Sequence, residues 1–213
     1  TDPAFRRIIA DRSKRINDRD PGLGQYVTWT EFVSADGLAK APEEGRLKLL
    51  ADLQYSPTER PIVAQFFTST PKHMEMAAAL AREMGFDGVD INMGCPDKSI
   101  EKQGAGSAHI KNPELAQEVI RAAQQGAQHV PVSVKTRLGY NQDQLETWLP
   151  KILETNPAVV TVHARTRKEM SLVPARWEGV QRAVEIRNEL GSSSLIFGNG
   201  DLKNVDDAYE KCA

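Results

Sequence analysis

The sequence predicts an α/β protein built from parallel strands, and two observations carry this prediction. Short β-branched or apolar runs alternate along the chain with longer stretches whose apolar residues recur at helical spacing. A helix between two strands returns the chain to the same end of the sheet, so successive strands run parallel. With 40% apolar and 26% charged residues, the composition is that of a globular protein, which excludes disordered, collagen-like and coiled-coil chains.

Six strands and five helices are predicted in alternation. In chain order the strands are Tyr26–Val33, Ile62–Phe67, Gly88–Met93, Val130–Thr136, Val159–Ala164 and Leu195–Gly198. The helices are Pro42–Leu53, Pro71–Met84, Pro113–Gln125, Gln142–Glu154 and Trp177–Glu189. Proline suits the first turn of a helix and glycine its end, so we expect Gly85, Gly126 and Gly191 to terminate helices.

Repeated βα units of this size are typical of a (β/α)8 TIM barrel or a doubly wound sheet. A complete barrel needs eight units and about 250 residues. A chain of 213 residues with six strands therefore fits an incomplete barrel of about six βα units. The length also favours one domain, residues 1–213.

Charge and cysteine content limit the environment of the protein. The 27 basic and 29 acidic residues give a net charge of −2, so a nucleic-acid surface would have to be local. The two cysteines, Cys95 and Cys212, cannot form a disulfide framework, and no apolar run approaches the length of a membrane span. We expect a cytoplasmic protein with no membrane contact. The chain opens at Thr1 without an apolar signal segment, and its first methionine is Met74, which suggests a fragment.

Groups able to hydrogen-bond a ligand lie where the predicted strands end, which is where parallel α/β folds place their chemistry. These residues are Gln65, Asn92, Cys95, Lys135, Arg137, His163, Arg165, Arg167, Asn199, Gly200 and Asp201. Each type alone is common in structural roles. Their recurrence at one edge of successive strands indicates a ligand site.

Five motifs in order resemble the tRNA-dihydrouridine synthase family. They are Asp90-Ile-Asn-Met-Gly-Cys95-Pro, Gly104-Ala-Gly106-Ser-Ala, Val134-Lys135-Thr-Arg137-Leu-Gly, Val162-His163-Ala-Arg165-Thr-Arg167 and Gly198-Asn199-Gly200-Asp201. The segments from Thr1 to Arg6 and from Glu31 to Leu38 are also similar to the family. The resemblance covers nearly the whole chain, and the motifs are specific as a set rather than singly.

The resemblance implies a flavoenzyme that uses FMN, with NADPH as electron donor, to reduce the C5–C6 double bond of uridine in tRNA. The residues expected to bind the cofactor are Gln65, Asn92, Lys135, His163, Asn199, Gly200 and Asp201. A cation such as Lys135 stabilises the negative charge of reduced FMN. No metal is implied.

The resemblance also gives Cys95 the catalytic role. Hydride would pass from flavin N5 to C6 of the base, and Cys95 is expected to supply the proton at C5. A cysteine thiol is ordinarily protonated at neutral pH, which suits a general acid. Cys212 has no comparable context.

A target base must leave its stack to reach the flavin, so phosphate contacts are expected around the site. Arg137, Arg165 and Arg167 are candidates for substrate or RNA contact, because they follow strand ends. A second basic cluster, on a predicted N-terminal helix, is more typical of a solvated surface; it comprises Arg6, Arg7, Arg12, Lys14, Arg15 and Arg19.

The chain departs from the family pattern at both ends. The resemblance implies a first strand before Thr1, an eighth strand after Ala213 and a helical C-terminal domain that holds tRNA. We therefore expect the chain to be strands two to seven, and to bind FMN poorly or be inactive by itself.

Three alternatives remain open on the residues alone. One is another FMN-dependent TIM-barrel oxidoreductase, similar to dihydroorotate dehydrogenases or ene-reductases, that acts on a small molecule. Another is an aldolase-like lyase with Lys135 as the Schiff-base lysine, although Arg137 and the amide-rich strand ends favour anion binding. The third is an RNA-binding fragment without catalysis.

Overall fold

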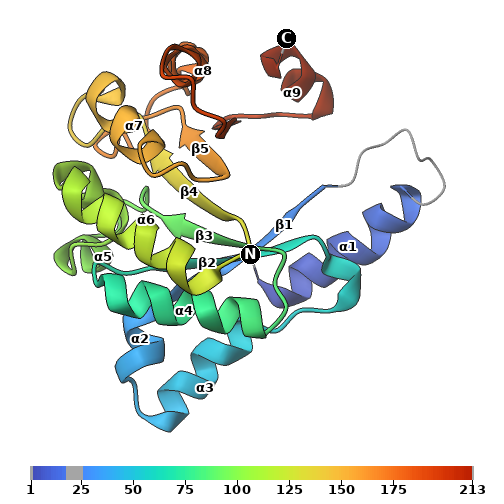
Figure 1. The fold of residues 1–213 in the computed structure, drawn as a ribbon. Coiled ribbons are helices and arrows are strands. Elements are labelled where there is room, and N and C mark those ends of the chain that lie inside the picture. The colour runs from blue at the N-terminus through green and yellow to red at the C-terminus, as the bar shows by residue number, and fades with distance from the viewer. Residues whose placement is uncertain (1, 18–25, 213) are drawn as a thin grey trace.

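The computed structural model describes residues 2–17 and 26–212, and its centre is one six-stranded sheet (Figure 1). All neighbouring strands are parallel and lie in sequence order. The strands are β1 (Thr28–Ser34), β2 (Ile62–Phe67), β3 (Gly88–Asn92), β4 (Val132–Arg137), β5 (Val159–His163) and β6 (Leu195–Asn199). The sequential parallel order confirms the predicted α/β class, an incomplete (β/α)8 barrel.

Helices follow every strand, and the five predicted ones are present. The α-helices are α1 (Pro3–Asn17), α2 (Ala35–Lys40), α3 (Glu43–Asp52), α4 (Pro71–Glu83), α5 (Lys98–Lys102), α6 (Pro113–Ala127), α7 (Leu145–Leu153), α8 (Trp177–Glu189) and α9 (Val205–Cys212), with 3-10 turns η1 (Pro57–Glu59) and η2 (Gly106–Lys111). The sequence did not predict α2, α5 and α9. They have at most eight residues, too few for a helical repeat of apolar positions to show.

Glycine at helix ends was predicted correctly at two positions of three. Gly85 and Gly191 have φ of 78° and 62° directly after helical segments, the left-handed conformation that favours glycine. Gly126 lies inside α6, so its prediction as a helix end was wrong. A Cβ there would meet the Glu75 carbonyl oxygen at 2.0 Å. Gly126 therefore allows α6 to approach α4 closely.

The two faces of the sheet differ in chemistry because successive side chains of a strand point to opposite sides. Val89 and Ile91 of β3 and Val134 of β4 are fully buried, within the main hydrophobic core that includes helical residues. The alternating positions carry polar side chains: Asp90, Asn92, Ser133, Lys135 and Arg137. We call the polar side the lumen face and the other the helix face.

The helix face is covered by a continuous helical layer (Figure 1). α4 packs on β2 and β3 and lies against α6, which also contacts β4. Trp148 of α7 is fully buried, and its Nε1 donates a hydrogen bond of 2.8 Å to the Thr136 hydroxyl of β4. This layer supplies most of the apolar burial and fixes the strands that carry the lumen-facing groups.

α1 is attached differently, through a buried ion pair. Arg6, 2% exposed, donates to the Glu59 carboxylate at 2.7 Å and to the Gln54 carbonyl at 2.9 Å. Phe5 and Ile8 on the same helix are more than half exposed.

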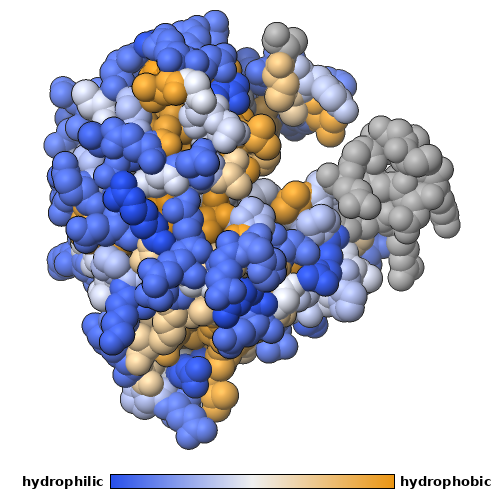
Figure 2. Space-filling view, in the orientation of Figure 1, coloured by the Kyte–Doolittle hydropathy of each residue, from blue (hydrophilic) through white to orange (hydrophobic). Residues whose placement is uncertain are grey.

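In the space-filling view the outer surface is mostly hydrophilic, with hydrophobic side chains in the recess beside α9 (Figure 2).

Candidate functional site

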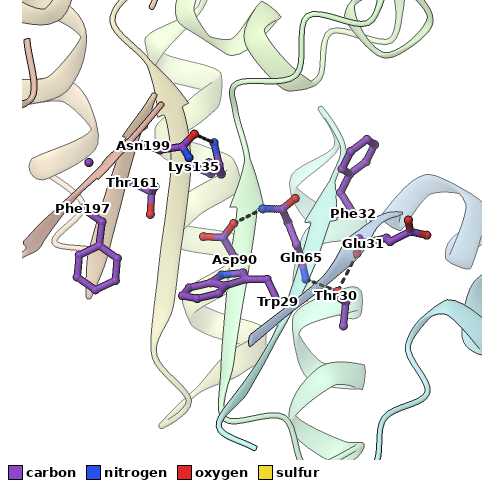
Figure 3. A pocket seen from close by; sticks show the side chains of 11 residues that line it. Trp29, Thr30, Glu31, Phe32, Gln65, Asp90, Lys135, Thr161, Phe197 and Asn199 are labelled. Atoms are coloured by element: carbon purple, nitrogen blue, oxygen red, sulfur yellow. Dashed lines mark hydrogen bonds between the residues drawn. The ribbon is translucent and has the colours of Figure 1, made fainter. Parts of the chain in front are cut away.

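A pocket of about 570 Å³ opens on the lumen face (Figure 3). Its lining comes from all six strands of the sheet. The residues are Trp29, Thr30, Glu31, Phe32, Gln65, Asp90, Lys135, Thr161, Phe197, Gly198 and Asn199. The volume suits a ligand of cofactor size, and the lining combines three aromatic side chains with seven polar or charged ones.

The centre of the pocket wall is a buried carboxylate. Asp90 accepts hydrogen bonds from Gln65 Nε2 at 2.6 Å and from the Ser133 hydroxyl. Burial raises the pKa of Asp90, although these two hydrogen bonds and the charge of Lys135 oppose the shift. Because Asp90 occupies the Gln65 amide nitrogen, the Gln65 oxygen is oriented toward Asn92, whose Nδ2 donates to it at 3.4 Å.

Lys135 and Asn199 meet across the pocket from β4 and β6. The Lys135 ammonium donates a hydrogen bond of 3.0 Å to Asn199 Oδ1. Burial lowers the pKa of Lys135, Asp90 raises it, and Arg137 lowers it further. A ligand that brings negative charge into this pocket would offset the cost of the buried ammonium.

Cys95 is the second residue of a loop, residues 94–107, that we call the thiol loop. The Asn92 side-chain oxygen accepts the backbone N–H groups of Gly94 and Cys95 at 3.1 and 2.9 Å, which fixes the start of the loop. The backbone N–H of Ser107 donates to the Cys95 carbonyl at 3.0 Å and closes it. Cys95 is partly buried. Asn92 thus positions the thiol loop from the end of β3, and it is not among the residues that line the pocket.

His163 is held as a neutral imidazole beside cations. Its pKa falls to about 4 through burial and through the nearby charges of Arg137, Lys135 and Arg165. Arg165 Nη1 donates to His163 Nε2 at 3.1 Å. A nitrogen that accepts carries no proton, so the Nδ1 atom of the neutral ring is the one protonated.

Asp201 is occupied by contacts within the chain. Its carboxylate pairs with Arg165 through two hydrogen bonds of 2.7 and 2.6 Å and accepts the Ala175 N–H at 2.8 Å. The neighbouring Gly200 carbonyl accepts Trp177 Nε1 at 3.0 Å. Gly200 and Asp201 are not among the pocket-lining residues, and their role in cofactor binding stays a prediction.

The three arginines predicted to contact substrate or RNA form contacts between loops. Arg165 and Arg137 are 5% and 7% exposed. Arg137 donates to the Gly94 carbonyl at 2.7 Å and to the Thr166 carbonyl at 3.2 Å. Arg167, partly buried, pairs with Glu101 of α5. Their contact with RNA stays a prediction.

Arg6, Arg7 and Arg12 of the N-terminal basic cluster lie on α1, as predicted, and are not among the pocket-lining residues. Arg6 is buried and paired with Glu59, and Arg7 is half exposed at 3.6 Å from the same carboxylate. Arg12 is exposed. Arg19, and the side chains of Lys14 and Arg15, lie outside what the structure describes.

Several lining residues were not singled out from the sequence. Trp29, Phe32 and Phe197 supply aromatic surface, and Thr30, Glu31 and Thr161 add polar groups. The pairing register of β1 with β2 slips between Trp29 and Phe32, which is a bulge that re-aims side chains at a strand edge. Nothing in single-sequence periodicity marks such a bulge. For Phe197 the sequence did offer a signal: it lies two positions before Asn199 in β6, so the two side chains point to the same face of the sheet.

Two kinds of feature are absent from the part of the chain that the structure describes. No helix in residues 2–17 and 26–212 is long and apolar enough to cross a bilayer. Over the same ranges, no group of three or more His, Cys, Asp or Glu residues is placed to hold a metal ion.

The fold and the site define a parallel α/β protein with a cofactor-sized pocket on the lumen face of its sheet and a cysteine on the loop that follows β3. The family model for dihydrouridine synthase matches residues 1–213. The chain belongs to the dihydrouridine synthase family, which confirms the resemblance found in its motifs.

Curated relatives agree over nearly the whole chain. A probable tRNA-dihydrouridine synthase of Staphylococcus epidermidis (strain ATCC 12228) is 40% identical over 212 residues, covering 99% of this chain and 60% of the relative. Probable tRNA-dihydrouridine synthase 2 of Bacillus subtilis (strain 168) is 35% identical over 203 residues, covering 95% and 58%. The chain therefore spans about 60% of the length of these relatives.

A solved structure, of a variant of NCR from Zymomonas mobilis, is similar over 81% of this chain and 70% of that chain, with a TM-score of 0.40 and 16% identity.

Proposed function

We propose that residues 1–213 form part of the catalytic domain of a tRNA-dihydrouridine synthase that binds FMN, takes electrons from NADPH and acts in the cytoplasm. The observation that supports this most is the lumen pocket with Gln65, Lys135 and Asn199 in its wall. Family membership and the names of the relatives supply the reaction, the reduction of uridine in tRNA.

The donor set of the pocket fits a flavin. An isoalloxazine has two broad apolar faces and a polar edge that becomes negatively charged on reduction. The pocket offers aromatic surface from Trp29, Phe32 and Phe197 together with the Lys135 ammonium and the Asn199 amide. When bound there, FMN would supply the hydride.

The residues of the chain divide the remaining work. Lys135, Gln65 and Asn199 would hold the polar edge of the cofactor. The neutral His163 would donate a hydrogen bond to the cofactor from its Nδ1–H. Asn92 positions the thiol loop through the Gly94 and Cys95 backbone. The Cys95 thiol would then hold the proton that goes to C5 of the base.

The test is dihydrouridine formation in an unmodified tRNA transcript, measured by mass spectrometry of nucleosides. The protein expressed from its complete gene is incubated with FMN, NADPH and the transcript. We expect dihydrouridine from the native protein, and a loss of about a hundredfold or more with Cys95→Ala, because a positioned general acid contributes about 10²–10⁴ in rate. Cys212→Ala, on the exposed helix α9, is the matched control and should retain activity.

Other outcomes would contradict the proposal in distinguishable ways. NADPH oxidation with a small enone and no dihydrouridine would indicate a small-molecule oxidoreductase. Binding of tRNA without reduction, unaffected by Cys95→Ala, would indicate an RNA-binding protein. Failure to retain FMN after desalting, combined with borohydride trapping of a ketone substrate on Lys135, would indicate the lyase.

A further inference from the structure

Besides the hydrogen bonds of Asn92 and Arg137 to its first residues, the thiol loop forms an ion pair with the segment that follows β5. Glu101 of α5 accepts two hydrogen bonds from Arg167: one of 2.7 Å from Nε to Oε1, and a shorter one from Nη2 to Oε2. The two side chains are only 9% and 22% exposed. A two-point contact between an arginine and a carboxylate that is largely out of water is stronger and better oriented than a surface pair.

Arg167 is a fixed partner for this contact. Its backbone N–H donates to the Gly139 carbonyl at 2.8 Å, and its guanidinium lies 5.1 Å from the centre of the Tyr140 ring. Burial alone would raise the pKa of Glu101, but hydrogen bonds from Arg167, Ser107 and Tyr140 hold it below its ordinary value. The carboxylate is therefore charged and paired at neutral pH.

Glu101 also connects this pair to Cys95. Its Oε1 accepts the Ser107 hydroxyl at 2.7 Å, and the Ser107 N–H donates to the Cys95 carbonyl at 3.0 Å. The path from Arg167 through Glu101 and Ser107 ends at the backbone of the cysteine. A change at the ion pair is thus transmitted to the thiol through two hydrogen bonds.

Two glycines give the loop backbone conformational freedom if this contact is lost. Gly104 and Gly106 have φ of 77° and 61°, conformations that glycine enters and leaves easily. Cys95 packs in a small apolar cluster with Phe67, Ile100 and Ala105, separate from the main core. The apolar packing of Cys95 is thus confined to this small cluster.

We propose that the Glu101–Arg167 ion pair is a latch that holds the thiol loop in the conformation in which Cys95 packs against Phe67, Ile100 and Ala105, so that Glu101 and Arg167 act as positioning residues for the thiol. The importance of this latch for uridine reduction rests on the proposed function. The shielding of the thiol does not, and it can be measured without flavin or RNA.

The test is the rate at which iodoacetamide labels Cys95 in the folded protein, read from the Cys95 peptide by mass spectrometry. Glu101→Gln and Arg167→Gln are each expected to raise this rate at least about threefold, the effect of about 0.7 kcal/mol from a largely buried pair. The double variant should match the single variants, because both break one contact. Cys212 in the same samples is an internal reference whose rate should stay unchanged.

The two single variants separate a latch from a simple charge effect. Removing a negative charge near a thiol favours the reactive thiolate, whereas removing a positive charge disfavours it. Charge alone would therefore speed labelling in Glu101→Gln and slow it in Arg167→Gln. Opposite signs, unchanged rates or additive effects in the double variant would each overturn the latch.

Two further variants guard against misfolding and nonspecific effects. Ser107→Ala removes the hydroxyl link to Glu101 but keeps the ion pair, and it too should raise the rate. Glu44→Gln breaks an exposed pair with Lys48 on α3 and should change nothing. Since labelling needs no cofactor, loss of dihydrouridine formation with an intact labelling pattern would count against the proposed function and leave the latch standing.

Discussion

The helix face and the lumen face of the same strands differ in the chemistry of the side chains they bury. On the helix face, Val89, Ile91, Val134 and Val160 are fully buried in one apolar core. On the lumen face, the alternating positions carry Asp90, Ser133, Lys135 and other polar groups, several of them buried as well. Both faces share the backbone hydrogen bonds of the sheet, so the difference lies in the side chains.

Burial has opposite consequences on the two faces. Burying apolar side chains stabilises the fold by roughly 25 cal/mol per Å². Burying charged groups costs free energy that their partners offset only in part, and apolar replacements are often as stable. The raised pKa of Asp90 and the lowered pKa of Lys135 are signs of that cost. A sheet built for stability alone would not need such a lumen, which indicates that this face is the chemical one.

The largest effect is expected on the helix face. Trp148→Ala removes a fully buried side chain and its hydrogen bond to Thr136. We expect the free energy of unfolding to fall by about 3–5 kcal/mol, measured by chemical denaturation. Thr161→Ala, partly buried on the lumen face, is the comparison and should cost about 1 kcal/mol or less. Equal losses for the two variants would break the contrast between the faces.

His109 is a titratable side chain buried among apolar residues, so it tests what burial of a polar group costs outside the lumen face. It lies on η2 between the buried residues Ala108 and Ile110, and it is fully buried itself. Its Nδ1 lies 3.1 Å from the Gly106 carbonyl, whereas its Nε2 has no hydrogen-bond partner in the described part of the chain. Burial lowers the pKa of His109 to about 4, from 6.5.

The pH dependence follows from this shift. Between pH 6.5 and 4 the unfolded chain binds a proton at His109 and the folded protein does not, so acidification favours unfolding. From pH 7 to pH 4, this histidine should lower the free energy of unfolding by about 3 kcal/mol. His109→Leu should remove that part of the decrease, measured by urea denaturation at several pH values. His129→Gln, at an exposed position, is the matched control, and an unchanged slope in His109→Leu would contradict the account.

Much of the fold could be predicted from the sequence because its signals are local. The buried strands β2 and β3 are continuous runs bounded by turns, and their predicted ends differ by at most one residue from the observed ones. The helices α4 and α8 show the same agreement, since each has several apolar turns. Short helices such as α5 escape because their position depends on packing rather than on their own pattern.

The site was predictable only to the level of which residues converge. Of the residues predicted to bind the cofactor, Gln65, Lys135 and Asn199 line one pocket, whereas Asn92, His163, Gly200 and Asp201 are not in its lining. What each side chain contacts was not visible, because ion pairs such as Arg165–Asp201 and Arg167–Glu101 join residues 36 and 66 positions apart. From the sequence alone, an arginine at a strand end has no identifiable partner, because the acidic residue that pairs with it is brought close only by the conformation of the loops.

The smallest effect on the free energy of unfolding is expected at Lys135, where a variant should weaken cofactor binding without destabilising the fold. Lys135→Met keeps most of the side-chain volume but removes the buried ammonium that donates to Asn199. We expect the free energy of unfolding to stay within about 1 kcal/mol or to rise, because a desolvated charge is lost. Affinity for FMN should fall about tenfold or more, since a hydrogen bond from a charged group contributes about 1.5–3 kcal/mol.

Flavin fluorescence titration and denaturation of the same preparations give both quantities. Lys48→Met, with a side chain 76% exposed on α3, is the matched control and should change neither. Unchanged FMN affinity in Lys135→Met would remove this residue from the cofactor site. A large loss of stability instead would mean that the ammonium is structural, and that the lumen face contributes to folding in the same way as the helix face.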